Sequence, residues 1–203
     1  MKNRVVITGS GIVSPIGNQI EDFLDSLKSG VNGVKKITLF DTTNHSVHIA
    51  AQCSIDLEQH FDKKEFNKLD RFSAFSLVAS EQAIKQANLL NSNNLDNIGV
   101  IVGSGIGGIN TFETQHKRLL QHPRKVSPYF IPSMISDIAA GQISIKYGFK
   151  GINYGIVSAC ATGNHAIGDA YRQIKYGDAD IIVCGGSEAS ISPMSIAGFS
   201  NMK

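Results

Sequence analysis

Short apolar runs alternate with longer amphipathic stretches along most of the chain. Four runs rich in β-branched residues predict strands at residues 4–8, 98–102, 152–157 and 180–184. The runs at 98–102 and 181–183 are apolar without interruption, which is typical of strands covered on both faces. Strands separated by helical stretches predict an α/β domain in which helices cover a sheet.

Helical periodicity is clearest in two segments. Residues 66–90 carry apolar and small side chains at spacings of three and four, which predicts one long helix. A second predicted helix, residues 161–176, begins just after Cys160 and ends at Gly177, a residue suited to the left-handed conformation of a helix end. Prolines at 123, 128 and 132 predict an irregular loop over residues 122–133, because each lacks a backbone donor.

Composition narrows the class of protein. The 203 residues are 42% hydrophobic, which is enough for one core, and the net charge of +2 is too small to indicate a nucleic-acid partner. No apolar run is long enough to cross a bilayer, and the apolar stretch near the N-terminus is too short for a signal peptide. Cys53, Cys160 and Cys184 are widely spaced without a CxxC pair, so we expect no disulfide framework, no metal site and a reducing cytoplasm.

The last residues indicate an incomplete domain. Residues 198–203 carry no stop signal for a helix and follow soon after Pro193. We therefore expect residues 1–203 to be the N-terminal part of a longer protein whose C-terminal half is absent.

Cys160 is the strongest candidate for chemistry. It lies where a predicted strand turns into a predicted helix, and the unpaired amides of a helix start favour a thiolate and can receive an oxyanion. Ala159, Ala161 and Gly163 keep the surroundings of the sulfur small, so that a thioester carbonyl can approach. A thiol suits thioester exchange because it is strongly nucleophilic and forms another activated ester.

The residues alone leave a plainer interpretation of Cys160 open, since many unpaired cysteines are simply small packed side chains. That interpretation is favoured for Cys53 and Cys184. His165 lies about 140° around the predicted helix from Cys160, so direct activation of the thiol is not expected. The other five histidines occupy polar segments and show no pattern of a catalytic base.

Five ordered motifs occur across the whole chain, namely RVVITG at residues 4–9, GSGIGG at 103–108, PRKVSP at 123–128, SACATG at 158–163 and GDAD at 177–180 leading to GGSE at 185–188. Their order and spacing resemble the β-ketoacyl-acyl-carrier-protein synthases, most closely type II. Polyketide synthase modules are less similar, because they usually have serines after the cysteine, where Ala161, Thr162 and Gly163 stand here.

The resemblance implies a fold and a reaction. The fold would be the α/β thiolase-like fold, with this chain supplying its N-terminal βαβαβαββ half, a mixed sheet between helix layers, in a homodimer. The reaction would be a decarboxylative Claisen condensation without a cofactor. Cys160 would accept the acyl chain from acyl carrier protein, and its amide would bind the oxyanion. Malonyl on carrier protein would then extend the chain by two carbons.

Further residues carry over from the resemblance. Ile106 matches the end of the acyl pocket, Phe130 matches a residue that crosses the dimer interface to that pocket, and Phe199 matches an aromatic beside the cysteine. Core packing remains the alternative for all three. Lys63, Lys64 and Lys68, which would begin the long helix, resemble the family's basic patch for acyl carrier protein.

Three departures limit these expectations. Asn67 stands where relatives often carry Arg, which would weaken the carrier-protein contact, and a solvated helix turn is the alternative. The family's two catalytic histidines and its second oxyanion donor belong to C-terminal motifs that this chain does not contain. We therefore expect that the 203 residues alone cannot complete condensation, and a non-catalytic structural half or partner subunit stays open.

A dinucleotide-binding oxidoreductase is the rival enzyme class. Residues 103–108 fit the G-x-G-x-x-G pattern after a predicted strand. The pattern also needs an acidic residue about 20 positions further on, at the end of a second strand. A proline-rich segment occupies that region here, so the match is weak.

Overall fold

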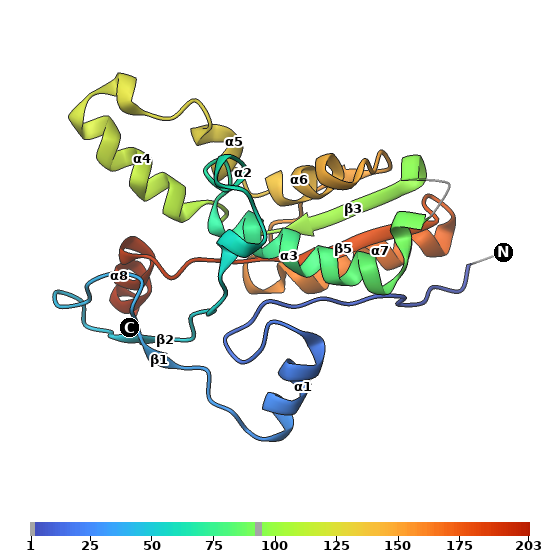
Figure 1. Cartoon of the computed structure of the whole chain (residues 1–203), viewed down its shortest axis with the longest axis horizontal. Helices are drawn as coiled ribbons and strands as arrows, with labels where there is room; N and C mark the ends of the chain where they lie inside the picture. The colour runs from blue at the N-terminus through green and yellow to red at the C-terminus, as the bar shows by residue number, and fades with distance from the viewer. Residues whose placement is uncertain (1–2, 92–94) are drawn as a thin grey trace.

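The computed structural model describes residues 3–91 and 95–203 and has the α/β arrangement that the sequence predicts (Figure 1). A three-stranded parallel sheet in the order β4-β3-β5 lies between helices, and a two-stranded antiparallel sheet, β1-β2, lies apart from it. The strands are β1 (Lys35–Lys36), β2 (Ile49–Ala50), β3 (Ile98–Gly103), β4 (Asn153–Tyr154) and β5 (Ile181–Gly186). The α-helices are α1 (Ile20–Lys28), α2 (Lys63–Phe66), α3 (Arg71–Gln86), α4 (Ile109–Gln121), α5 (Phe130–Met134), α6 (Ile138–Tyr147), α7 (Thr162–Tyr176) and α8 (Pro193–Asn201).

Strand β3 is the centre of the sheet and is buried along its whole length, as its uninterrupted apolar run predicts. Its side chains alternate between the two faces. Val100 and Val102 belong to the larger core with α3 and α6, while Ile101 packs with Ala166 and Ala170 of α7. The helices therefore form a layer on each side of the sheet.

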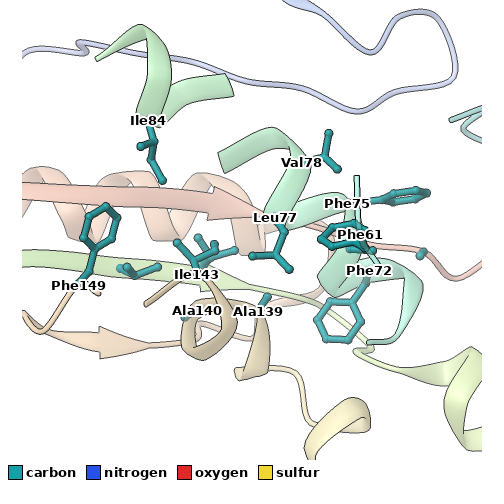
Figure 2. Packing of buried hydrophobic residues seen from close by; sticks show 14 of the residues in the cluster. Phe61, Phe72, Phe75, Leu77, Val78, Ile84, Ala139, Ala140, Ile143 and Phe149 are labelled. Atoms are coloured by element: carbon teal, nitrogen blue, oxygen red, sulfur yellow. The ribbon is translucent and has the colours of Figure 1, made fainter. Parts of the chain in front are cut away.

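The larger core fills the space between the sheet and the α3–α6 layer (Figure 2). Phe72, Leu77 and Ile84 of α3 and Ile143 of α6 are almost completely buried there. Ala139 and Ala140 of α6 keep that helix close to the sheet because their side chains are small. This packing fixes the carboxyl ends of β3 and β5, from which the candidate site is built.

The long helix predicted at residues 66–90 is shorter and interrupted. Residues 63–66 form the separate helix α2, and α3 begins only at Arg71. Asp70 starts α3 as its N-cap, with its side chain accepting a hydrogen bond from the Phe72 amide. Helix α3 ends before Asn88, which has a left-handed φ of 55°. Periodicity alone did not register these polar residues, which favour helix ends over helix interiors.

The strand predicted at residues 4–8 does not form, and this prediction is wrong. The N-terminal segment is instead held by α3, whose Gln86 and Gln82 side chains accept hydrogen bonds from the amides of Ser10 and Ile12. A cavity of about 500 Å³ separates residues 5–9 from β5. The segment does not pair with β5, which is at the edge of the described sheet and is only half-buried.

Two other predicted segments differ in extent. The strand predicted at 152–157 pairs only at residues 153–154, and the predicted loop 122–133 contains a 3₁₀ turn at Pro123–Lys125 and helix α5. Pro132 is tolerated in α5 because it lies in the first turn, where an amide has no partner within the helix.

The helix predicted at 161–176 is confirmed as α7, and Gly177 ends it with a φ of 89°. Among the residues described, no helix combines the length and apolar character that crossing a bilayer requires.

Candidate active site

Cys160 lies in a single 3₁₀ turn, Ala159–Ala161, that leads directly into α7. The predicted position at the start of a helix is therefore confirmed. Ala159, immediately before it, has a φ of 50°, a left-handed conformation that is strained for a residue with a side chain. Such a sharp turn presents the side chain that follows it, and Cys160 is exposed.

A cavity of about 550 Å³ opens at this turn between the ends of β3, β5 and the helices α7 and α8. Three of the predicted site residues line it together, namely Cys160, Ile106 and Phe199. Ile106 is 42% exposed and Phe199 is 60% exposed, so both present apolar surface that the fold itself does not cover. The cavity can therefore take an apolar chain beside the sulfur.

The turn after β3 forms one wall of this cavity and is held by Glu188. One carboxylate oxygen of Glu188, Oε2, accepts hydrogen bonds from the amides of Gly105 at 2.9 Å and Ile106 at 3.1 Å. The other oxygen accepts one from the Ser104 hydroxyl at 3.2 Å, and that hydroxyl accepts one from the Gly107 amide. These glycine-rich amides thus bind the protein's own carboxylate, which argues against the pyrophosphate site of the dinucleotide-binding alternative.

Sequence reasoning missed this role of Glu188. In the sequence, Glu188 stands only as the end of the motif at 185–188, and its partners are more than eighty residues away along the chain. The signal that was available is that both motifs directly follow apolar runs predicted as strands. The carboxyl ends of parallel strands meet at one edge of a sheet, so the two motifs had to lie together.

The other two cysteines are in different surroundings. Burial raises the pKa of the Cys184 thiol, and burial also raises the pKa of the Cys53 thiol although the charge of Arg71 opposes it. A raised pKa disfavours the thiolate, which is the nucleophilic form. The interpretation of Cys53 and Cys184 as packed side chains is supported, and Cys160 is the cysteine that lines the cavity at a helix start.

His165 does not serve Cys160 directly. Its Nδ1 lies 2.7 Å from the hydroxyl of Ser158, two residues before the cysteine, and the Ser158 amide donates to the Thr162 hydroxyl. The imidazole therefore helps to fix the start of the turn. No histidine is among the described residues that line the cavity.

Phe130 lies apart from this site. It is on α5, packs against Phe112 of α4 with ring centroids 6.4 Å apart, and is not part of the cavity lining. The expected role of Phe130 requires a second copy of the chain, so that role stays a prediction.

The three lysines of the predicted carrier-protein patch do not begin the long helix, and this part of the prediction is wrong. Lys63 and Lys64 lie on the short helix α2, whose N-cap is Asp62, and both are exposed. Lys68 follows α2, and its Nζ lies 5.1 Å from the centre of the Tyr129 ring. The patch is thus a surface turn beside α5.

Sequence comparison identifies related proteins over the whole chain. Residues 2–203 match the family described as Beta-ketoacyl synthase, N-terminal domain. The 3-oxoacyl-[acyl-carrier-protein] synthase 2 of Staphylococcus aureus (strain COL) is 50% identical over 200 residues, 97% of this chain and 48% of that protein. The same-named protein of Vibrio cholerae serotype O1 is 45% identical over 205 residues, 100% of this chain and 50% of that protein. The chain thus spans about half the length of these curated relatives.

Solved structures agree on the fold. A β-ketoacyl synthase from Burkholderia phymatum STM815 superposes with a TM-score of 0.86 at 27% identity, over 100% of this chain and 50% of that one. A type II polyketide ketosynthase, solved in complex with its acyl-carrier protein, gives 0.83 at 27% identity over 100% of this chain and 57% of that one. The expected thiolase-like fold is confirmed, and the chain belongs to the β-ketoacyl synthase family, whose N-terminal domain it contains.

Proposed function

We propose that this chain provides the acylated half of a condensing enzyme of fatty acid synthesis, with Cys160 as the acceptor of the growing chain. One observation carries the proposal: an exposed cysteine lies on a strained turn at the start of α7 and lines an apolar cavity. The curated relatives that match nearly all of the chain are 3-oxoacyl-ACP synthases, which supports this reaction class.

The first step is transfer of an acyl group between two sulfurs. The Cys160 thiolate attacks the carbonyl carbon of the incoming thioester, and the resulting tetrahedral intermediate carries a negative oxygen. Collapse of the intermediate breaks the bond to the carrier's sulfur, which leaves as a thiolate and takes up a proton. The Cys160 amide, in the turn that leads into α7, would donate a hydrogen bond to the oxyanion.

The second step extends the chain by two carbons. Loss of carbon dioxide from a malonyl thioester leaves a carbanion, which attacks the carbonyl of the acyl-Cys160 thioester and expels the cysteine thiolate. The enolate oxygen formed on decarboxylation needs hydrogen-bond donors. Because the described cavity lining contains no histidine, we propose that these donors come from elsewhere in the whole protein and that the 203 residues alone do not condense substrates.

The proposed partner is acyl carrier protein, carrying acyl and malonyl groups. The ketosynthase solved with its acyl-carrier protein supports this partner, and the exposed Lys63 and Lys64 would meet its acidic surface. We further propose a homodimer in the cytoplasm, with α5 at or near the interface. Exposed apolar side chains on and beside α5, Tyr129 and Ile131, support an interface there.

The test is formation of a 3-oxoacyl product from acyl and malonyl carrier proteins, measured by mass spectrometry. We expect product from the full-length gene product, none after Cys160→Ser, and none from the 203-residue chain by itself. A Cys53→Ser variant is the matched control and is expected to keep activity. Product from the Cys160→Ser variant would contradict the proposed chemistry, and product from the isolated chain would contradict the requirement for further residues.

The alternative of a structural half or partner subunit has one supporting observation, which is that no histidine is among the described residues that line the cavity around Cys160. Such a subunit would leave Cys160 unmodified by acyl donors. Acylation of the cysteine therefore separates the two functions.

A further inference from the structure

The turn that follows β3 depends on a single carboxylate for its shape. Within residues 104–107 three successive amides point inward, and Gly107 has a left-handed φ of 76°. Glu188 binds two of these amides directly and the third through the Ser104 hydroxyl. Ser104 is only 1% exposed, so the turn is anchored on its buried side as well.

The same turn contacts both functional parts of the cavity. A methyl group built on Gly105 would lie 3.0 Å from the Glu188 carboxylate and 3.3 Å from the Cα of Ala159, the strained residue before Cys160. The next residue, Ile106, extends into the cavity that Cys160 lines. The turn therefore lies between Glu188 and the cysteine turn, and it carries the apolar wall.

The backbone directly before Glu188 is bound to β3 and α3. Ser187 donates its amide to the carbonyl of Gly103 at 3.0 Å and its hydroxyl to the carbonyl of Phe72 at 2.7 Å. These bonds tie the residue before Glu188 to the end of β3 and to the start of α3. Glu188 thus follows directly on a residue that is hydrogen-bonded to β3 and α3, while its carboxylate binds the turn after β3.

From this geometry we propose that Glu188 is a positioning residue that sets the acyl-chain selectivity of the Cys160 site by holding Ile106 in the cavity wall. This inference rests on the proposed function. Loss of the carboxylate leaves the Gly105 and Ile106 amides, and the Ser104 hydroxyl, without their acceptor, so the turn changes conformation and Ile106 leaves its place. The cavity then discriminates less between chains of different length.

A glutamine at this position separates hydrogen bonding from charge. The side-chain oxygen of Gln can accept both the Gly105 and the Ile106 amide, and its amino group can donate to the Ser104 hydroxyl. We therefore expect Glu188→Gln to keep the selectivity of the wild-type protein, whereas Glu188→Ala loses it. Asp56→Ala is the matched control, because Asp56, like Glu188, is exposed and binds a backbone amide, but it lies outside the cavity.

The experiment measures the rates at which Cys160 is acylated by carrier proteins bearing eight-carbon and sixteen-carbon chains, using intact mass of the full-length gene product. Loss of two charge-assisted hydrogen bonds is expected to change the ratio of the two rates by about tenfold in Glu188→Ala. The ratio should stay within about twofold of wild type in Glu188→Gln and Asp56→Ala. A merely structural role would lower both rates together through loss of folded protein and leave the ratio unchanged.

The outcomes are distinguishable from failure of the proposed function. If wild-type protein is not acylated at all, the proposed function is wrong. If it is acylated and Glu188→Ala keeps the wild-type ratio, the positioning role of Glu188 is overturned. Should Glu188→Ala fail to fold, Ser104→Ala removes only the bond to the Gly107 amide and one bond to the carboxylate. That variant is expected to shift the ratio in the same direction by a smaller factor, and an unshifted ratio would overturn the inference.

Discussion

Ile106 lines the same cavity as Cys160, so we expect its size to limit the space for an acyl chain. Its side chain is partly exposed in the cavity, and the turn that carries it is held in place by Glu188. Replacement by Phe adds volume to the wall without adding a polar group. We expect Ile106→Phe to shorten the longest acyl chain that Cys160 accepts, measured by intact mass with a series of acyl donors.

A matched control for this prediction is Ile145→Phe, because Ile145 is 75% exposed on α6 and lies outside the cavity lining. That variant is expected to keep the chain-length preference of the wild-type protein. An unchanged preference in Ile106→Phe would remove this residue from the pocket.

Tyr147 on α6 carries a buried hydroxyl for which the described residues provide no hydrogen-bond partner. Burial, followed by the charges of Glu81 and Glu65, raises the pKa of Tyr147 to about 12. An unfolded tyrosine loses its proton near pH 10, at about its ordinary pKa. Between about pH 10 and about pH 12 the folded state therefore retains a proton that the unfolded state has lost, and the free energy of unfolding falls as the pH rises.

We expect Tyr147→Phe to remove the fall in the free energy of unfolding that Tyr147 causes between about pH 10 and about pH 12. Urea unfolding at a series of pH values measures this. At pH 7 the variant should be as stable as wild type or more stable by up to about 1 kcal/mol, because it buries no unsatisfied hydroxyl. An equally steep decline in wild type and variant above pH 10 would show that Tyr147 ionises as freely in the folded state as in the unfolded state.

At the scale of elements, Asp70 joins helices α3 and α4. Asp70 is 2% exposed. One of its carboxylate oxygens accepts a hydrogen bond from the Phe72 amide of α3 at 3.3 Å, and the other accepts one from the Thr111 amide of α4 at 2.8 Å. We expect Asp70→Ala to lower the free energy of unfolding by about 2 to 4 kcal/mol, since it removes two caps and leaves buried amides unpaired. Chemical denaturation measures this loss.

Asp62 provides the comparison for Asp70. It caps only the short helix α2, from an exposed position, through one bond to the Glu65 amide. Asp62→Ala should therefore cost clearly less than Asp70→Ala. Equal losses in the two variants would mean that Asp70 does not connect α3 and α4 energetically.

The short helix α2 and the turn after it present the basic patch. Reversing the charge at Lys64 and Lys68 is expected to weaken binding of the acidic carrier protein, mainly by slowing association. The effect should shrink as salt is added, because exposed charges are screened. Surface plasmon resonance at low and moderate salt measures the association rate and the affinity, and Lys35→Glu on β1 is the control. Equal affinities for the Lys64→Glu/Lys68→Glu variant and wild type would favour a solvated turn without a binding role.

Elements whose signals are local were predictable from the sequence. The buried strand β3, the helix α7 and its end at Gly177 follow from apolar runs, periodicity and one glycine. The turn at Cys160 was also found, because small residues surround a cysteine between two such elements. The break before α3 was not predicted, because the apolar spacing continues through residues 66–70. The side chain of Asp70 binds a backbone amide and so begins a new helix at that point.

Features that depend on distant partners were not predictable in the same way. A β-branched run at residues 4–8 has strand propensity, but a strand needs a neighbour, and the segment lies across a cavity from β5. Likewise, nothing local to Glu188 shows that its carboxylate binds amides of the turn after β3. The resemblance placed Ile106 and Phe199 near the cysteine, and the structure brings them to one cavity, whereas Phe130 lies elsewhere.

At the scale of the whole molecule, the N-terminal segment and the outer side of β5 leave apolar surface uncovered. The cavity between them is lined by residues of α3, α7 and β5, and Ile7 is 88% exposed. A domain of this size normally covers most such surface. The relatives are about twice as long as this chain, so we expect further structure in the whole protein to cover this face.

We expect Cys160, and no other cysteine of this chain, to receive the acyl chain. The most direct measurement is peptide mapping by mass spectrometry after incubation of the protein with an acyl carrier protein thioester. We expect one acyl group per chain, located on the peptide that contains Cys160 and absent after Cys160→Ser. An acyl group on Cys53 or Cys184, or a folded protein that stays unmodified, would contradict the claim.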